Sequence, residues 1–341
     1  MRPLPLRRHG ENVNLSYVTS SGETGAAGSS TDIERLDGEV SGIVKRFKKD
    51  EEAAPDVTAI GLIKSSYVNA IEYTGIAAHV RGLVIFFGVF VACGLIGIGQ
   101  LFLFDIISDG LERIIDQVFA FFSCVIIVFG MYFLLSAVRI EFFRPEDEPI
   151  IFDRRHRKVY RLFREVHPGL TGLLKRWPLH AVEYEWDLID AEHNAVLTNT
   201  GSSVMRYHSL IFIVRKSATD PTIIDSFPVG HTVQLGELSV APVWEHIRRF
   251  MEQDGPHLPP GESLNINSAP RTLWESWVEV APVGPAYART WKTLPLLMVF
   301  HHLTLPLCVP VFFFWGIFNW MSYRTATPIA WPQEVLDAVK K

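Results

Sequence analysis

Five adjacent side chains form the densest cluster of charge in the sequence: Arg154, Arg155, His156, Arg157 and Lys158. Cations close to a membrane surface attract anionic lipid head groups, and each contributes about 1 kcal/mol. The same residues could contact a partner protein, or could form a solvated turn that only favours one membrane orientation. We therefore name four candidate residues for contact with a membrane surface or a partner: Arg154, Arg155, Arg157 and Lys158.

A second group of polar side chains lies inside an apolar run near the C-terminus. His301 and His302 are adjacent, and Asn319 follows near the far end of the run. Ionisable residues within a membrane span are candidate functional residues. Adjacent helical residues point about 100° apart, so the two histidines cannot easily face one site. We expect hydrogen bonds between helices, with a role in proton or ion movement as the alternative.

The remaining reactive side chains predict neither a catalytic site nor a metal site. The Ser202-Ser203 pair lacks the Gly-x-Ser-x-Gly elbow of a hydrolase, and no phosphate-binding loop is visible. Neither the other histidines nor the cysteines have the spacing of metal ligands. The histidines considered for catalysis in the soluble domain are His180, His193, His208, His231 and His246, and the three cysteines are Cys93, Cys124 and Cys308. The sequence thus predicts a non-enzymatic protein with no metal and no cofactor.

The elements that carry these residues begin with three apolar runs, at 82–104, 118–138 and 294–321. A helix of roughly 20 residues crosses a hydrocarbon core of about 30 Å, and each run is long enough. Lipid cannot satisfy backbone polar groups, so such runs become helices. In the third run Pro306 and Pro310 predict a kink, and we favour a bent span over a re-entrant loop. The sequence predicts an integral membrane protein with three transmembrane helices.

The charges beside the apolar runs predict the orientation of the chain. Residues 105–117, between the first two runs, are mostly acidic, whereas basic residues are frequent from Arg139 onward. Lys and Arg close to a span mark the cytoplasmic side. We expect a multi-pass membrane protein with its N-terminus and its main soluble domain in the cytoplasm. Residues 322–341 would then lie outside.

Between the second and third runs the hydrophobic pattern becomes that of a β-rich domain. The segments with strand-like composition are 150–153, 158–164, 182–188, 209–215 and 222–227. Residues 242–253 form an amphipathic helix, with Pro242 at its first position and Trp244 in its apolar stripe. Antiparallel strands closed by one C-terminal helix resemble a pleckstrin-homology-like domain, a comparison of fold alone.

Composition divides this α+β membrane protein into six segments. They are a disordered N-terminal segment (1–55), a juxtamembrane segment with the hairpin of spans (56–138), the cytoplasmic β-rich domain (139–260), a linker (261–293), the third span (294–321) and a C-terminal tail (322–341). The first segment is poor in large apolar side chains, which is typical of disorder. The net charge of −5 argues against a nucleic-acid partner.

Several motifs of the β-rich domain resemble a known family. They are Pro149-Ile150-Ile151-Phe152-Asp153-Arg154, Lys158-Val159-Tyr160-Arg161, Trp186, and the helix from Val243 to Glu252 with Gly255-Pro256 and Leu258-Pro259 behind it. Over roughly residues 80–321 the sequence resembles proteobacterial inner-membrane proteins of unassigned function that are often encoded near type VI secretion genes. The resemblance implies immunity to a secreted toxin or handling of an effector, and it implies no catalytic residues.

The leading hypothesis is an inner-membrane protein that binds a partner protein. One alternative is a membrane-anchored lipid-sensing or scaffold module, suggested by the basic cluster. Another is a small transporter or channel component, suggested by the two histidines. Expected partners are the lipid bilayer and a type VI effector or toxin. The spacing of Gly88 and Ala92 permits close approach of helices, so a homo-oligomer is also considered.

Overall fold

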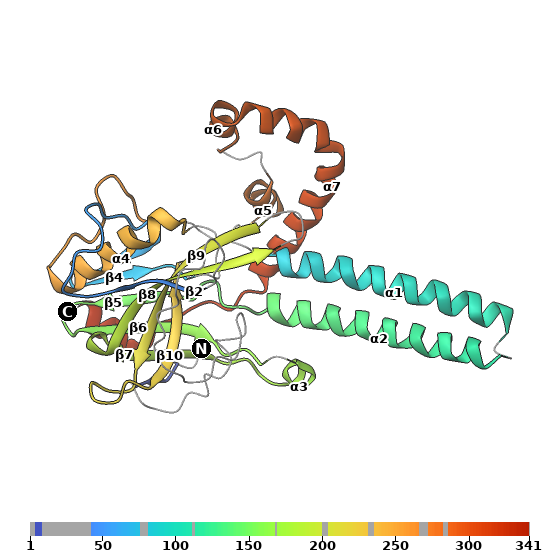
Figure 1. The fold of residues 1–341 in the computed structure, drawn as a ribbon, viewed down its shortest axis with the longest axis horizontal. Coiled ribbons are helices and arrows are strands. Elements are labelled where there is room, and N and C mark those ends of the chain that lie inside the picture. Colours follow the sequence, from blue (N-terminus) through green and yellow to red (C-terminus); the bar gives the residue numbers. More distant parts are fainter. Residues whose placement is uncertain are drawn as a thin grey trace.

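The computed structural model describes residues 4–8, 42–75, 81–110, 113–167, 169–199, 204–230, 235–265, 272–281 and 286–340. In these residues a two-sheet β domain is joined to a long helical hairpin and to several C-terminal helices (Figure 1). The hairpin projects from one end of the β domain (Figure 1). The chain is therefore an α+β protein with mainly antiparallel sheets, as the sequence predicts.

The hairpin consists of α1 (Leu83–Asp109) and α2 (Ile114–Glu141). Both helices are long and apolar enough to cross a membrane, in agreement with the first two predicted runs. Small residues allow the two helices to approach each other closely. A Cβ atom added to Gly88 would lie 2.2 Å from the Cβ atom of Ala137. The small residue Gly88 therefore serves the packing of α1 on α2 within one chain.

The first sheet has six strands in the order β1-β7-β6-β5-β4-β3, and only the β1–β7 pair is parallel. Its strands are β1 (Leu6–Arg7), β3 (Ile63–Ser66), β4 (Ala70–Tyr73), β5 (Ile150–Asp153), β6 (Lys158–Arg164) and β7 (Leu179–Glu185). A short 3₁₀ turn, Trp186–Leu188, leads from β7 to the second sheet. The predicted strands at 150–153 and 158–164, on either side of the basic cluster, are thus present as β5 and β6.

The second sheet is antiparallel throughout, in the order β10-β9-β8-β2. Its strands are β2 (Gly42–Phe47), β8 (Ile189–Asn199), β9 (Val204–Arg215) and β10 (Ile223–Val229). Buried aromatic rings fill the core, with Trp186 and Phe212 each 5.8 Å from Trp244 between ring centroids. Trp244 belongs to α4 (Glu237–Glu252), which is the predicted capping helix. This helix begins before the predicted residue 242 because buried Val240 extends its apolar stripe.

The N-terminal part of the chain differs from the prediction of disorder over residues 1–55. Two of its segments are strands, and each forms one edge of a sheet: β1 pairs with β7, and β2 pairs with β8. Residues 1–3 and 9–41 lie outside the described part of the chain. The strands β3 and β4 also come from before the hairpin. The β domain is therefore larger than residues 139–260, because backbone pairing recruits edge strands that have no distinctive composition.

The predicted linker and third span contain three helices. These are α5 (Leu273–Val280), α6 (Ala286–Thr293) and α7 (Pro295–Arg324). The segments Pro295–Pro306 and Cys308–Arg324 of α7 meet at 84°. The bend lies where Pro306 and Pro310 interrupt the helical hydrogen bonds, as expected of proline. In Figure 1 the helix α7 turns away from the hairpin instead of running beside it.

The C-terminal tail returns to the β domain as α8 (Gln333–Lys340). Val335 and Val339 are buried in a cluster with Ala70, Ile151 and Tyr160 of the six-stranded sheet. Thr327 also forms a β-bridge with Pro145, next to the end of α2. A single crossing by residues 294–321 would place α8 across a bilayer from the domain it packs on. The packing of α8 therefore argues against a third one-way span with residues 322–341 outside, because residues 261–293 hold no apolar run for a compensating crossing. The third span stays a prediction, since α7 could cross a membrane only as a bent pair of segments.

Candidate functional site

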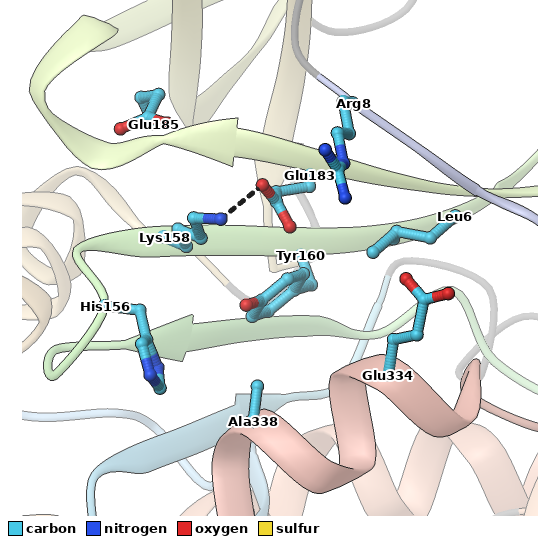
Figure 2. Close-up of a pocket in the computed structure, with 9 residues that line it drawn as sticks. All are labelled: Leu6, Arg8, His156, Lys158, Tyr160, Glu183, Glu185, Glu334 and Ala338. Atoms are coloured by element: carbon cyan, nitrogen blue, oxygen red, sulfur yellow. Dashed lines mark hydrogen bonds and ion pairs between the residues drawn. The ribbon is translucent and has the colours of Figure 1, made fainter.

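One hollow in the described part of the domain lies on the outer face of the six-stranded sheet. It is a pocket of about 510 Å³ formed by β6, β7, the β5–β6 turn, α8 and the segment around β1 (Figure 2). Its lining residues are Leu6, Arg8, His156, Lys158, Tyr160, Glu183, Glu185, Glu334 and Ala338. We call this the distal pocket. It brings together residues that lie more than 300 positions apart in the chain.

Strand alternation explains why these side chains face outward. Successive residues of a strand point to opposite faces of the sheet. On β7, Val182 and Tyr184 are buried in the core, so Glu183 and Glu185 face the pocket. The strand predicted at 182–188 therefore ends at Glu185, and its polar face forms one wall of the pocket.

The distal pocket carries mixed charge. Lys158 Nζ donates to Glu183 Oε1 at 2.5 Å, while Glu185 and Glu334 are exposed carboxylates (Figure 2). Burial and the carboxylates nearby raise the pKa of Tyr160, so its hydroxyl stays protonated. None of the nine lining residues is a serine, threonine or cysteine. The site is suited to bind charged groups of another molecule.

The cluster predicted as a contact site lies in the turn between β5 and β6, and we call it the basic turn (residues 154–158). Carboxylates of the domain largely neutralise its charge. Arg154 forms an ion pair with Asp254 at 2.5 Å and lies 5.0 Å from the ring centroid of Phe250. Arg157 pairs with two carboxylates, those of Asp187 at 2.5 Å and Glu252 at 3.1 Å. Lys158 pairs with Glu183, and Arg155 is exposed. Of the four predicted residues, only Lys158 lines the distal pocket.

The basic turn lies at the end of the sheet that is farthest from the hairpin. At the other end of β6, the Arg164 guanidinium donates to the carbonyl oxygens of Arg139 and Ile140 in the last turn of α2. The seven residues from Lys158 to Arg164 span roughly 20 Å of strand. A turn at this distance from the hairpin is poorly placed to contact the membrane that the hairpin would cross.

The polar residues of the third apolar run serve internal hydrogen bonds. His302 Nδ1 donates to the Met298 carbonyl oxygen at 2.6 Å, and its Nε2 accepts from the Tyr287 hydroxyl of α6 at 2.9 Å. Asn319 is buried and donates to the Arg81 carbonyl oxygen at 3.1 Å. The side chain of His301 lies outside the described part of the structure. His302 therefore joins α7 to α6, whereas Asn319 joins α7 to Arg81, just before α1.

A buried polar cluster joins the hairpin to the domain, and the sequence analysis did not identify it. Arg81, just before α1, donates to the carbonyl oxygens of Arg144, Pro145 and Ser322. Glu141 at the end of α2 is fully buried and accepts from the Gly82 amide at 2.9 Å and the Ser322 hydroxyl at 2.8 Å. The sequence signal that could have located this cluster is an ionisable residue beside each of the first two apolar runs: Arg81 precedes the first run, and Glu141 follows the second. These contacts fix the start of α1, the end of α2 and the end of α7 together.

Within the described residues, no group of three or more His, Cys, Asp or Glu side chains could hold a metal ion.

No curated protein and no solved structure matches the chain. Residues 126–340 match a family described as a family of unknown function, DUF6708. The match covers well over half of the 341 residues, from the middle of α2 to the end of α8. The chain therefore belongs to this family of unknown function, DUF6708.

Proposed function

We propose that the protein is a non-enzymatic membrane protein whose β domain binds a partner protein through the distal pocket. The observation that carries this proposal is the mixed-charge lining of a pocket at the end of the domain opposite the hairpin. A partner could approach this face without obstruction by a bilayer. Side chains of a protein supply both cations and anions, and such complementarity favours specific association. The antiparallel domain closed by α4 is consistent with the pleckstrin-homology-like comparison, which stays a hypothesis of fold.

We further propose that α1 and α2 cross the bacterial inner membrane with the N-terminus and the β domain in the cytoplasm. The support is the acidic connector at 105–117 and the basic residues that follow α2. The proposed role is immunity to a type VI toxin or handling of an effector. That role rests on the resemblance of motifs to inner-membrane proteins encoded near type VI secretion genes.

A competition assay between sister cells tests the proposed role. Cells that lack this protein should be killed by siblings with an active type VI system and should survive beside siblings without one. Wild-type protein should restore survival, whereas the charge reversal Glu185→Arg with Glu334→Arg should not. Asp56→Arg is a matched control, because Asp56 is an exposed carboxylate outside the pocket. Survival of the deletion strain would contradict immunity, and full rescue by the pocket variant would contradict binding at the distal pocket.

A further inference from the structure

The segment from Gly169 to Trp177, which we call the α3 loop, exposes large apolar side chains beside the base of the hairpin. It contains the short helix α3 (Gly169–Leu174). Leu170 is 71% exposed and Leu174 is 92% exposed. In Figure 1, α3 projects beside the domain end of α2. Neighbouring leucines with this degree of exposure mark a contact surface when they lie close together.

Contacts with the last turn of α2 hold the α3 loop in place. Arg139 of α2 donates to the carbonyl oxygen of Lys175, and its guanidinium lies 5.4 Å from the ring centroid of Trp177. The Arg164 guanidinium lies 4.7 Å from the same ring, and Trp177 Nε1 donates to the Gly172 carbonyl oxygen at 3.0 Å. The loop is therefore anchored at the residue where the apolar span of α2 ends.

The backbone of the loop is compact and its charge is positive. A Cβ atom added to Gly172 would lie only 1.7 Å from the carbonyl oxygen of His167, so this tight turn requires glycine. Lys175 and Arg176, directly after the two leucines, are exposed. Apolar side chains followed by basic ones, at the level of a membrane surface, are typical of segments that lie in the lipid interface. The long basic side chains can reach head groups while the leucines enter the acyl boundary.

We propose that the α3 loop is a second membrane contact that inserts Leu170 and Leu174 into an anionic lipid surface. Lys175 and Arg176 bind the phosphate groups of that surface. Together with α7 at the opposite side of the hairpin base, the loop would fix how the β domain is tilted relative to the bilayer. This inference rests on the proposed membrane crossing of α1 and α2, and it is independent of the partner that the distal pocket binds.

Fluorescence quenching on the full chain in lipid nanodiscs tests the proposal. Single-cysteine variants carry an environment-sensitive dye at Leu174→Cys, at Val68→Cys, or at the native Cys124, with the other cysteines changed to Ala. Val68 is a matched control, because it is 66% exposed and its carbonyl oxygen accepts from Arg154 in the basic turn. Cys124 lies inside α2 and reports whether the hairpin is inserted. The nanodiscs contain phosphatidylglycerol or only phosphatidylcholine, with spin labels on the head group or deep in the acyl chain.

The expected result separates the loop from the hairpin. Head-group spin labels should quench the dye at residue 174 at least about twofold in anionic nanodiscs, as expected for a side chain 5–10 Å into the interface. The dye at residue 68 should be unaffected, and the dye at Cys124 should be quenched by deep labels. The variant Lys175→Gln with Arg176→Gln should reduce the quenching at 174 to its level in neutral lipid. Quenching at Cys124 without quenching at 174 would overturn the inference, whereas no quenching at Cys124 would instead overturn the proposed membrane crossing.

Discussion

In the core of the β domain, the imidazole of His246 on α4 makes two hydrogen bonds. Its Nδ1 accepts from the Tyr73 hydroxyl at 2.6 Å, and its Nε2 donates to the Pro256 carbonyl oxygen at 3.0 Å. Burial lowers the pKa of His246 to about 4, although the Pro256 carbonyl and the Glu262 carboxylate favour the charged form. The imidazole is therefore neutral in the folded protein at neutral pH, because burial disfavours its charged form. The residue therefore couples folding to pH.

We predict that the full-length protein loses stability as the pH falls from about 6.5, where histidine titrates in an unfolded chain, towards the lowered pKa of His246. Over this range the unfolded state binds a proton on this residue that the folded state does not bind, so stability rises with pH. The loss of stability from this residue is on the order of 3 kcal/mol once the pH lies below both pKa values. The measurement is the free energy of unfolding in urea at a series of pH values.

The matched control for this prediction is His246→Gln, which keeps one acceptor and one donor but does not titrate. Its free energy of unfolding should depend less on pH between these limits, whatever its stability at neutral pH. If the variant and the wild-type protein lost stability in parallel, the pH dependence would have to come from other groups. His193 is the first of these, since burial and the neighbouring His208 lower its pKa as well.

At the scale of elements, α4 packs on the core of the β domain through the large side chain of Trp244. Trp244 is fully buried, and it stacks on Trp186 and Phe47 with ring centroids 5.8 and 5.9 Å away. Its Nε1 has no hydrogen-bond partner among the described residues. The contribution of Trp244 is therefore that of apolar contact, and α4 is positioned by packing of rings from both sides of the core.

We predict that Trp244→Ala lowers the free energy of unfolding by about 3–5 kcal/mol, because it leaves a large cavity among aromatic rings. Trp244→Phe should cost clearly less, since it keeps most of the ring contact and removes the unpaired donor. Leu238→Ala on the same helix is the control: Leu238 is 90% exposed, and a surface change of this kind stays within about 0.5 kcal/mol. Similar losses for Trp244→Ala and Leu238→Ala would show that α4 does not cap the core. Denaturant unfolding of the full chain measures all three.

For the whole molecule, the decisive contact is that of α8 with the six-stranded sheet. The chain leaves the β domain after residue 265, forms α5 to α7, and returns to the domain at Thr327 and α8. The ends of α1 and α2 meet the same domain through Arg81 and Glu141. If the hairpin crosses a membrane twice, the domain and both of its flanking segments must lie on one side. The bent helix α7 then lies at or within the near side of that membrane.

We predict that labelling of single-cysteine variants in spheroplasts places the β domain and α8 on the same side. A membrane-impermeant maleimide should label Arg113→Cys in intact spheroplasts, and should label Val68→Cys and Lys340→Cys only after lysis. All three residues are exposed. Labelling of Lys340→Cys together with Arg113→Cys would instead restore a third one-way span. Labelling of Val68→Cys and Lys340→Cys without Arg113→Cys would keep this topology and reverse its orientation.

The sequence alone determined the elements whose patterns are local. Runs of apolar residues predicted α1 and α2, because a helix satisfies its own backbone hydrogen bonds within the segment. Alternation and turn composition predicted β5, β6 and the inward face of β7, and a stripe at helical spacing predicted α4. For the candidate site, the sequence identified Lys158 within the basic cluster. It could not identify Glu185 or Glu334 as its neighbours.

Only the tertiary structure decided how distant segments pair. The strands β1 and β2 are edges held by backbone hydrogen bonds to β7 and β8, and such pairing leaves little trace in side-chain composition. The helix α8 in the tail was not predicted, and its docking depends on a sheet whose strands lie more than 150 residues earlier in the chain. The same docking formed the distal pocket and argues against a third one-way span. Hydrophobic periodicity is a property of neighbouring residues and can be recognised in the sequence. The register of the edge strands and the docking of α8 instead depend on which surfaces remain uncovered after the rest of the chain has folded.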